Sequence, residues 1–146
     1  MLGGFWSAYW YNGYLYGSEI ARGLDVFRLT PSEFLTKNEI EAATLVHQNE
    51  FNPQHQSRIT WPSSLVVARA YLDQLNRDKA ITAAHAAAIK SAIENADRKK
   101  ASHDQLAAAA SQLQSDAANA QGRDVERIKA LSELLTTATS PGASRF

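Results

Sequence analysis

The clearest structural signal in the chain is the stretch FWSAYWYNGYLY, residues 5–16. Two aromatic-rich runs flank Asn12-Gly13, and this dipeptide favours a type I′ turn because both central residues must take positive φ. A two-residue turn also fixes which residues of the two strands lie opposite each other. The expected pairs are Tyr11–Tyr14, Trp10–Leu15 and Tyr9–Tyr16.

Successive side chains of a strand point to opposite faces. The register therefore predicts Trp6 and Trp10 on one face, and Phe5, Tyr9 and Tyr11 on the other. A strand that is apolar on both faces is expected to be covered on both sides. The aromatic residues predicted to form an interaction surface are Phe5, Trp6, Tyr9, Trp10, Tyr11, Tyr14 and Tyr16.

Residues 24–29 predict a third strand, because apolar and polar residues alternate after the turn at Gly23. Three strands make a small antiparallel meander, which is barely enough for independent stability. We therefore interpret residues 1–30 as an incomplete, propeller-blade-like sheet whose aromatic faces need a partner.

The composition changes at Trp61-Pro62. Eleven of the 13 aromatic residues lie at or before Pro62, whereas 21 of the 25 alanines lie after it. Aromatic residues favour strands and alanine favours helices. The predicted fold class is thus mainly α: a small N-terminal β meander, then short helices, then a C-terminal four-helix bundle.

Residues 31–61 predict short helices and a polar connector. Thr30 with Glu33, and Thr36 with Glu39, each have the spacing of a capping box. Two short helices or one broken helix are therefore expected to run to about Val46. From residue 47 to 61 the chain is rich in Asn, Gln, His and Pro, which is typical of a surface connector.

Residues 62–139 predict four helices, and residues 140–146 a disordered tail. The expected helix starts are Ser63 or Ser64, Thr82, Ser102 and Asp124, with Gly122 closing the third helix. The expected core stripes, which recur at helical spacing, are Leu65, Val66, Ala68, Leu72 and Leu75; Ile81, Ala88, Ile89, Ile93 and Ala96; Leu106, Ala109, Ala110, Leu113 and Ala117; and Val125, Ile128, Leu131 and Leu135.

Charge and cysteine content exclude several classes of function. The formal net charge is zero and no Lys or Arg precedes Arg22, which argues against nucleic acid or an anionic membrane as the main partner. The absence of cysteine excludes disulfides and thiolate chemistry. Residues 1–18 are uncharged, but Asn12-Gly13 interrupts them, so neither a membrane span nor a signal peptide is expected.

No motif predicts catalysis, a metal site or a cofactor. His47, Glu50 and His55 gather in the polar connector, but their spacing fits no metal motif, and a solvated loop explains them. Gly17-Ser18 lacks the second glycine of a nucleophile elbow. His85 and His103 stand alone near predicted helix starts. We therefore predict that the chain is not an enzyme.

Glu19, Arg22 and Asp25 are the only candidates for a polar ligand site. They lie near the expected strand turns, where two acids could flank one guanidinium. The alternative, which the sequence favours, is a set of surface ion pairs of little energetic weight.

Residues 8–26, from Ala8-Tyr9-Trp10-Tyr11-Asn12-Gly13 to Leu24-Asp25-Val26, resemble the last blade segment of bacterial LVIVD-repeat proteins. The continuation through Asn52-Pro53-Gln54 is similar to the segment that follows the predicted propeller in that family, and residues 61–139 loosely resemble helical modules appended there. The preceding blades are absent from this chain. The resemblance implies an extracytoplasmic or cell-surface location and carries no catalytic residues.

Two classes of function remain. The first is a non-catalytic structural or protein-interaction module, in which the aromatic segment docks on a protein partner, a larger sheet or a second copy. The second is a sugar- or peptide-binding accessory segment of an exported enzyme. Rings packed against residues 31–61 or a partner would favour the first, and rings lining an open groove would favour the second.

Overall fold

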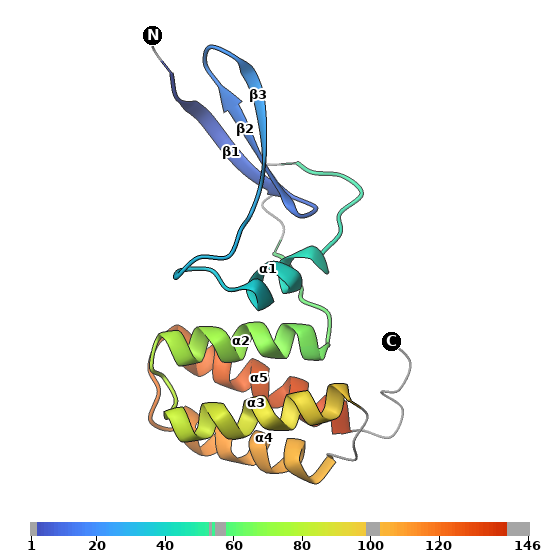
Figure 1. Cartoon of the computed structure of the whole chain (residues 1–146), viewed down its shortest axis with the longest axis vertical. Coiled ribbons are helices and arrows are strands. Elements are labelled where there is room, and N and C mark those ends of the chain that lie inside the picture. The colour runs from blue at the N-terminus through green and yellow to red at the C-terminus, as the bar shows by residue number, and fades with distance from the viewer. Residues whose placement is uncertain (1–2, 53, 55–57, 99–102, 140–146) are drawn as a thin grey trace. The chain divides into compact units, whose positions relative to one another are not determined.

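The computed structural model describes residues 3–52, 54, 58–98 and 103–139. The fold is mainly α with a small N-terminal antiparallel sheet (Figure 1), which confirms the predicted fold class. The chain forms two compact units, residues 1–62 and 63–146, and the boundary coincides with the change in composition. The elements are β1 (Phe5–Tyr11), β2 (Tyr14–Glu19), β3 (Gly23–Arg28), α1 (Lys37–Thr44), α2 (Leu65–Arg77), α3 (Ala83–Asp97), α4 (His103–Ala117) and α5 (Arg123–Thr139).

The hairpin forms as the sequence predicts. Asn12 has φ 48° and Gly13 has φ 91°, so both central residues of the turn take the left-handed conformation that a type I′ turn requires. The pairs Tyr11–Tyr14, Trp10–Leu15 and Tyr9–Tyr16 are confirmed. The strand order is β1-β2-β3, so β2 is the central strand.

A β-bulge interrupts the beginning of β1. Ser7 pairs with Ser18, but Phe5 pairs with Glu19, so the register shifts by one residue between them. A bulge inserts one residue into a strand and changes the face to which the side chains beyond it point. The alternation rule assumes unbroken pairing, and no residue pattern in β1 indicates the bulge.

The bulge places Phe5 on the opposite face from Tyr9 and Tyr11, so the prediction that the three share a face was wrong. The Phe5 ring packs edge-on against Phe27, with the ring centroids 5.8 Å apart. It also covers Gly17, where an added Cβ would lie 2.7 Å from two Phe5 ring carbons. An aromatic ring over a strand glycine replaces the packing that the missing side chain would supply.

Only the second of the two predicted capping boxes forms. Thr36 accepts a hydrogen bond from the Glu39 N–H, and the Glu39 carboxylate accepts one from the Thr36 N–H, which starts α1. The prediction of a helix from Thr30 was wrong. Ser32 closes a local turn with Leu35 instead, and the extended backbone of Thr36 prevents a helix from continuing across it.

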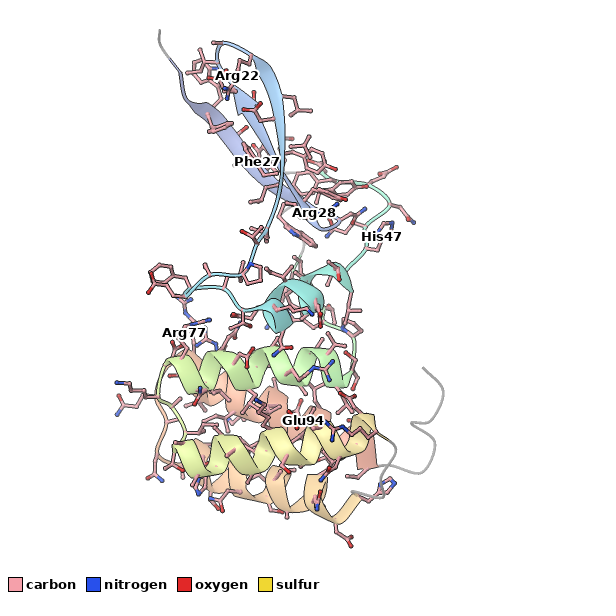
Figure 2. All side chains as sticks on the ribbon, viewed as in Figure 1. Arg22, Phe27, Arg28, His47, Arg77 and Glu94 are labelled. Carbon is pink, nitrogen blue, oxygen red and sulfur yellow. The ribbon has the colours of Figure 1, made fainter. Side chains whose placement is uncertain are left out.

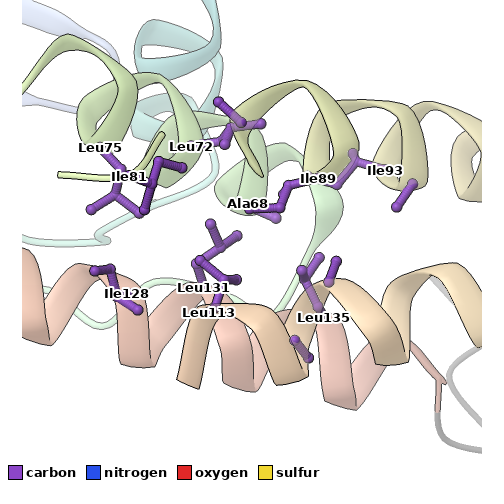
Figure 3. Close-up of a cluster of buried hydrophobic side chains, with 14 of the residues drawn as sticks. Ala68, Leu72, Leu75, Ile81, Ile89, Ile93, Leu113, Ile128, Leu131 and Leu135 are labelled. Atoms are coloured by element: carbon purple, nitrogen blue, oxygen red, sulfur yellow. The ribbon is translucent and has the colours of Figure 1, made fainter. Parts of the chain in front are cut away.

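The second unit is a four-helix bundle closed around one core. Each helix packs against two neighbours, so that the helices follow one another around the core in the order α2, α3, α4, α5, and α5 packs against α2. Ser64 and Thr82 accept the capping hydrogen bonds at the starts of α2 and α3, as predicted. Figure 3 shows side chains from all four helices in the core, whose fully buried members are Ala68, Leu75, Ile89, Ile93, Leu113, Ile128, Leu131 and Leu135.

Some details of the bundle differ from expectation. Ala88 is exposed, and Ala86 and Ala92 lie in the core beside Ile89 and Ile93 instead, because alanine gives little indication of which face of a helix is buried. α5 begins at Arg123, so Asp124 lies inside its first turn. Ser102 and the predicted tail lie outside the described residues.

The bundle is expected to fold without residues 1–62. A chain of residues 63–146 should melt cooperatively by helical circular dichroism, and Ile93→Ala should lower its free energy of unfolding by about 2–5 kcal/mol because it leaves a cavity. Ala88→Ser, at an exposed position of the same helix, is the control and should cost less than about 1 kcal/mol. A non-cooperative melt, or equal effects of the two substitutions, would contradict this.

The contact between Phe5 and Gly17 predicts a coupled pair of substitutions. Gly17→Ala should destabilise the sheet by about 1–3 kcal/mol, because the new methyl group overlaps the Phe5 ring. In a Phe5→Ala background the same change should cost much less. Denaturant unfolding followed by tryptophan fluorescence measures this unit alone, since Trp6, Trp10 and Trp61 all lie within residues 1–62. Equal costs in both backgrounds would refute the contact.

Candidate functional site

The sheet exposes large apolar side chains on both faces. Trp6 is 77% exposed at the bulge, Leu24 is 65% exposed, and Phe5 and Phe27 are about half exposed. Phe5, Leu24 and Phe27 lie on paired strand positions, and Trp6 is the bulge residue between the paired residues Phe5 and Ser7. The exposed area is therefore an ordered surface, and Figure 2 shows its side chains along the strands.

One face of the sheet carries four tyrosines, and an aromatic ring from the connector packs beside three of them. Phe51 lies 5.6 Å from Tyr9 and 5.7 Å from Tyr11, and Tyr11 lies 6.3 Å from Tyr16, measured between ring centroids. The four rings line an open pocket of about 240 Å³ with an almost entirely apolar wall. The sequence reasoning missed Phe51, whose only signal was a lone aromatic residue in a polar segment.

The hairpin turn holds the segment that carries Phe51. The Asn12 side-chain amide donates to the Gln48 carbonyl (2.9 Å) and accepts from the Gln48 N–H (2.8 Å). The Tyr11 hydroxyl donates to the same carbonyl at 2.9 Å. The turn residue Asn12 thus sets the strand register and also anchors residues 48–51 beside the tyrosine face.

The opposite face carries Trp10 and Leu15, which are half-buried, beside Phe5 and Phe27. It is apolar and remains open, since Phe27 is still 45% exposed. Tyr14 lies on the tyrosine face at the start of β2, where Arg28 donates to its hydroxyl (3.0 Å) and lies over its ring.

The structure brings the predicted polar site together at the turn between β2 and β3, where Figure 2 labels Arg22. Glu19 is only 6% exposed. One of its carboxylate oxygens accepts from the Gly4 N–H (3.1 Å), and the other from the Ala21 and Arg22 N–H groups (2.8 and 2.6 Å). The Arg22 guanidinium also donates to Asp25 at 2.7 Å.

These bonds give Glu19 a structural role. The Gly4 and Arg22 N–H groups lower the pKa of the Glu19 carboxyl most, burial opposes them in part, and the Ala21 N–H and the Arg22 charge lower it further. A carboxylate held by three backbone donors has little capacity left for a ligand. Glu19 ties the start of β1 to the β2–β3 turn, and Arg22 with Asp25 forms an exposed ion pair beside it.

Histidines and acids elsewhere form no metal cluster among the described residues. His55, one of the three residues that gather in the connector, lies outside them. His85 contacts both carboxylate oxygens of Asp116 at 3.1 Å and links α3 to α4, and His103 contacts the Thr139 carbonyl. Within the described ranges, no helix is long and apolar enough to cross a membrane.

A comparison of the chain with protein-family models, curated proteins and solved structures finds no match.

The bonds to Glu19 predict an acid-sensitive sheet. Because the folded pKa lies below the ordinary value of 4.5, the stability from Glu19 is fully present above pH 4.5 and is lost as the pH falls through the folded pKa. Backbone amide resonances of Gly4, Ala21 and Arg22 should titrate together with one midpoint below 4.5. Glu19→Gln should remove this transition and weaken the sheet at pH 7, whereas the control Asp25→Asn should keep it. Three separate midpoints would contradict the assignment.

Proposed function

We propose that this chain is a non-catalytic protein-interaction module whose N-terminal aromatic sheet docks on a protein surface or completes a larger sheet. One observation carries the proposal: the paired strands expose Phe5 and Phe27 to solvent, and the bulge in β1 exposes Trp6 beside them. Ordered apolar patches rimmed by polar residues are typical of interaction sites. The absence of Lys and Arg before Arg22 fits a protein partner better than nucleic acid.

The free energy gained by burying Phe5 and Trp6 alone is too small to drive association. Covering the exposed parts of Phe5 and Trp6 removes on the order of 250 Å² from water, which gives about 6 kcal/mol at ~25 cal/mol per Å². Association costs about 4–15 kcal/mol in lost freedom of motion. The rings alone thus offset only the lower part of that range, so a partner must also use the other rings or the open strand edges.

The LVIVD-repeat resemblance is consistent with this proposal and stays a prediction. A three-stranded antiparallel meander is the kind of unit that a propeller blade contains, and its partner in that case is a neighbouring blade. The described sheet has open strands on both sides of β2, which supports completion from outside.

The pocket lined by Tyr9, Tyr11, Tyr16 and Phe51 favours a second candidate, a peptide-binding accessory role. Packing of Tyr9 and Tyr11 on Phe51 supports the interaction module, whereas the open pocket beside the same rings supports ligand binding. The nearly apolar wall suits a peptide better than a sugar, because sugars need polar partners beside the rings. Phe51→Ser should abolish such binding and leave docking through Trp6 intact.

Where the docking partner is a second copy, the proposal predicts that the double variant Trp6→Ser/Trp10→Ser loses self-association while its helical melt is unchanged. Sedimentation velocity of the full chain measures the association, and Trp61→Ser is the matched control, since Trp61 is also exposed but lies outside the sheet. A wild-type chain that stays monomeric at high concentration, with Trp6 and Trp10 shielded from a soluble quencher, would falsify the proposal.

A further inference from the structure

The two outer strands of the sheet differ in how their edges are protected. β1 and β3 flank β2, and within the described residues neither pairs with a strand on its other side. β3 carries Asp25 and Arg28, and charged side chains on an edge strand discourage further pairing. β1 contains no charged residue and no proline from Phe5 to Tyr11. Its edge is thus the one open to another strand.

The regular part of β1 is complementary to itself. The bulge affects only the start of the strand, so residues 7–11 form an uninterrupted run. If two such runs pair antiparallel about a two-fold axis at Tyr9, Ser7 faces Tyr11 and Ala8 faces Trp10. The register keeps each face matched, because residues 7, 9 and 11 share one face and residues 8 and 10 share the other.

The side-chain sizes fit this register. Ala8 is an exposed, small residue in the middle of an aromatic strand. Antiparallel pairing about Tyr9 sets the Trp10 ring of one copy over Ala8 of the other, twice by symmetry, which is the large-beside-small packing that well-packed interfaces use. The exposed Trp6 then lies beside the hairpin turn of the second copy.

We infer that β1 pairs with β1 of a second copy of this chain, antiparallel and centred on Tyr9, to form a six-stranded sheet. This inference rests on the proposed function, because it names the partner of the same sheet. Such a contact uses the same patch on both copies and closes on itself, so it yields a dimer and no filament. The net charge of zero means that two copies do not repel each other.

The available area indicates a weak dimer. The exposed parts of Phe5, Trp6 and Tyr9 amount to on the order of 300 Å². Backbone pairing of five residues buries further area. The total buried area stays at the low end for specific interfaces, below about 1,200 Å² for both partners together. We therefore expect association in the micromolar range, visible only at high protein concentration.

The inference can be tested in the full chain by introducing charges at Tyr9, which lies on the two-fold axis of the inferred dimer. Tyr9→Lys and Tyr9→Glu each place two like charges side by side in a homodimer, so each variant alone should associate at least about tenfold more weakly than wild type. An equimolar mixture should form a 1:1 heterodimer in sedimentation velocity, because Lys then faces Glu. Leu24→Lys and Leu24→Glu, on the same face of β3, are the controls and should leave association unchanged, alone or mixed.

Ala8→Trp tests the same register without touching the packing on Phe51. The substitution enlarges the exposed apolar surface, so nonspecific hydrophobic association would increase. In the inferred dimer, however, it sets two large rings opposite each other, so the specific dimer should weaken. Stronger association of Ala8→Trp, or a mixture of the Tyr9 variants that stays monomeric, overturns the inference.

The outcome for the wild-type chain separates this inference from the proposed function. A monomer whose tryptophans are open to a soluble quencher overturns the second-copy inference and leaves the proposed function standing with a different protein partner. A monomer with shielded tryptophans overturns both.

Discussion

Asn12 and Gly13 take φ values of 48° and 91°, and the turn that they form constrains the whole N-terminal unit. Its two-residue loop fixes the register that places Tyr9, Tyr11 and Tyr16 on one face. The Asn12 side chain then binds the Gln48 backbone at both its N–H and its carbonyl. Without this turn, neither the strand pairing nor the position of Phe51 would be set, and the aromatic surface would have no defined shape.

The two units differ in where their large apolar side chains lie. In the bundle, residues such as Leu75, Leu113 and Leu131 are fully buried by neighbouring helices. The sheet of the first unit is three strands wide and leaves Trp6 and Phe5 exposed, because no described element covers its outer strands. This contrast explains why we place structural stability mainly in the bundle and interaction in the sheet.

The hairpin register and the caps at Thr36, Ser64 and Thr82 could be predicted because each depends on residues a few positions apart. The bulge at Phe5 and the turn at Ser32 could not, because each replaces one local hydrogen-bond pattern with another of similar energy. The buried face of the alanine-rich helix α3 was only partly predicted, since Ala86 and Ala88 look alike in sequence and tertiary packing decides between them. Of the candidate site, the tyrosines and the Glu19 cluster could be predicted from the sequence. Phe51 could not, because its position depends on a contact with Tyr11, 40 residues away along the chain.

The central claim is that the sheet is completed by a protein strand or surface from outside its own sequence. Hydrogen exchange of the β1 backbone amides, measured across a range of concentrations of the full chain, tests it most directly. Our account predicts that protection of those amides of residues 7–11 that point away from β2 increases with concentration, while protection of β3 and of the bundle core stays constant. Exchange in β1 that is fast and independent of concentration, with no protection gained on adding other proteins, would contradict it.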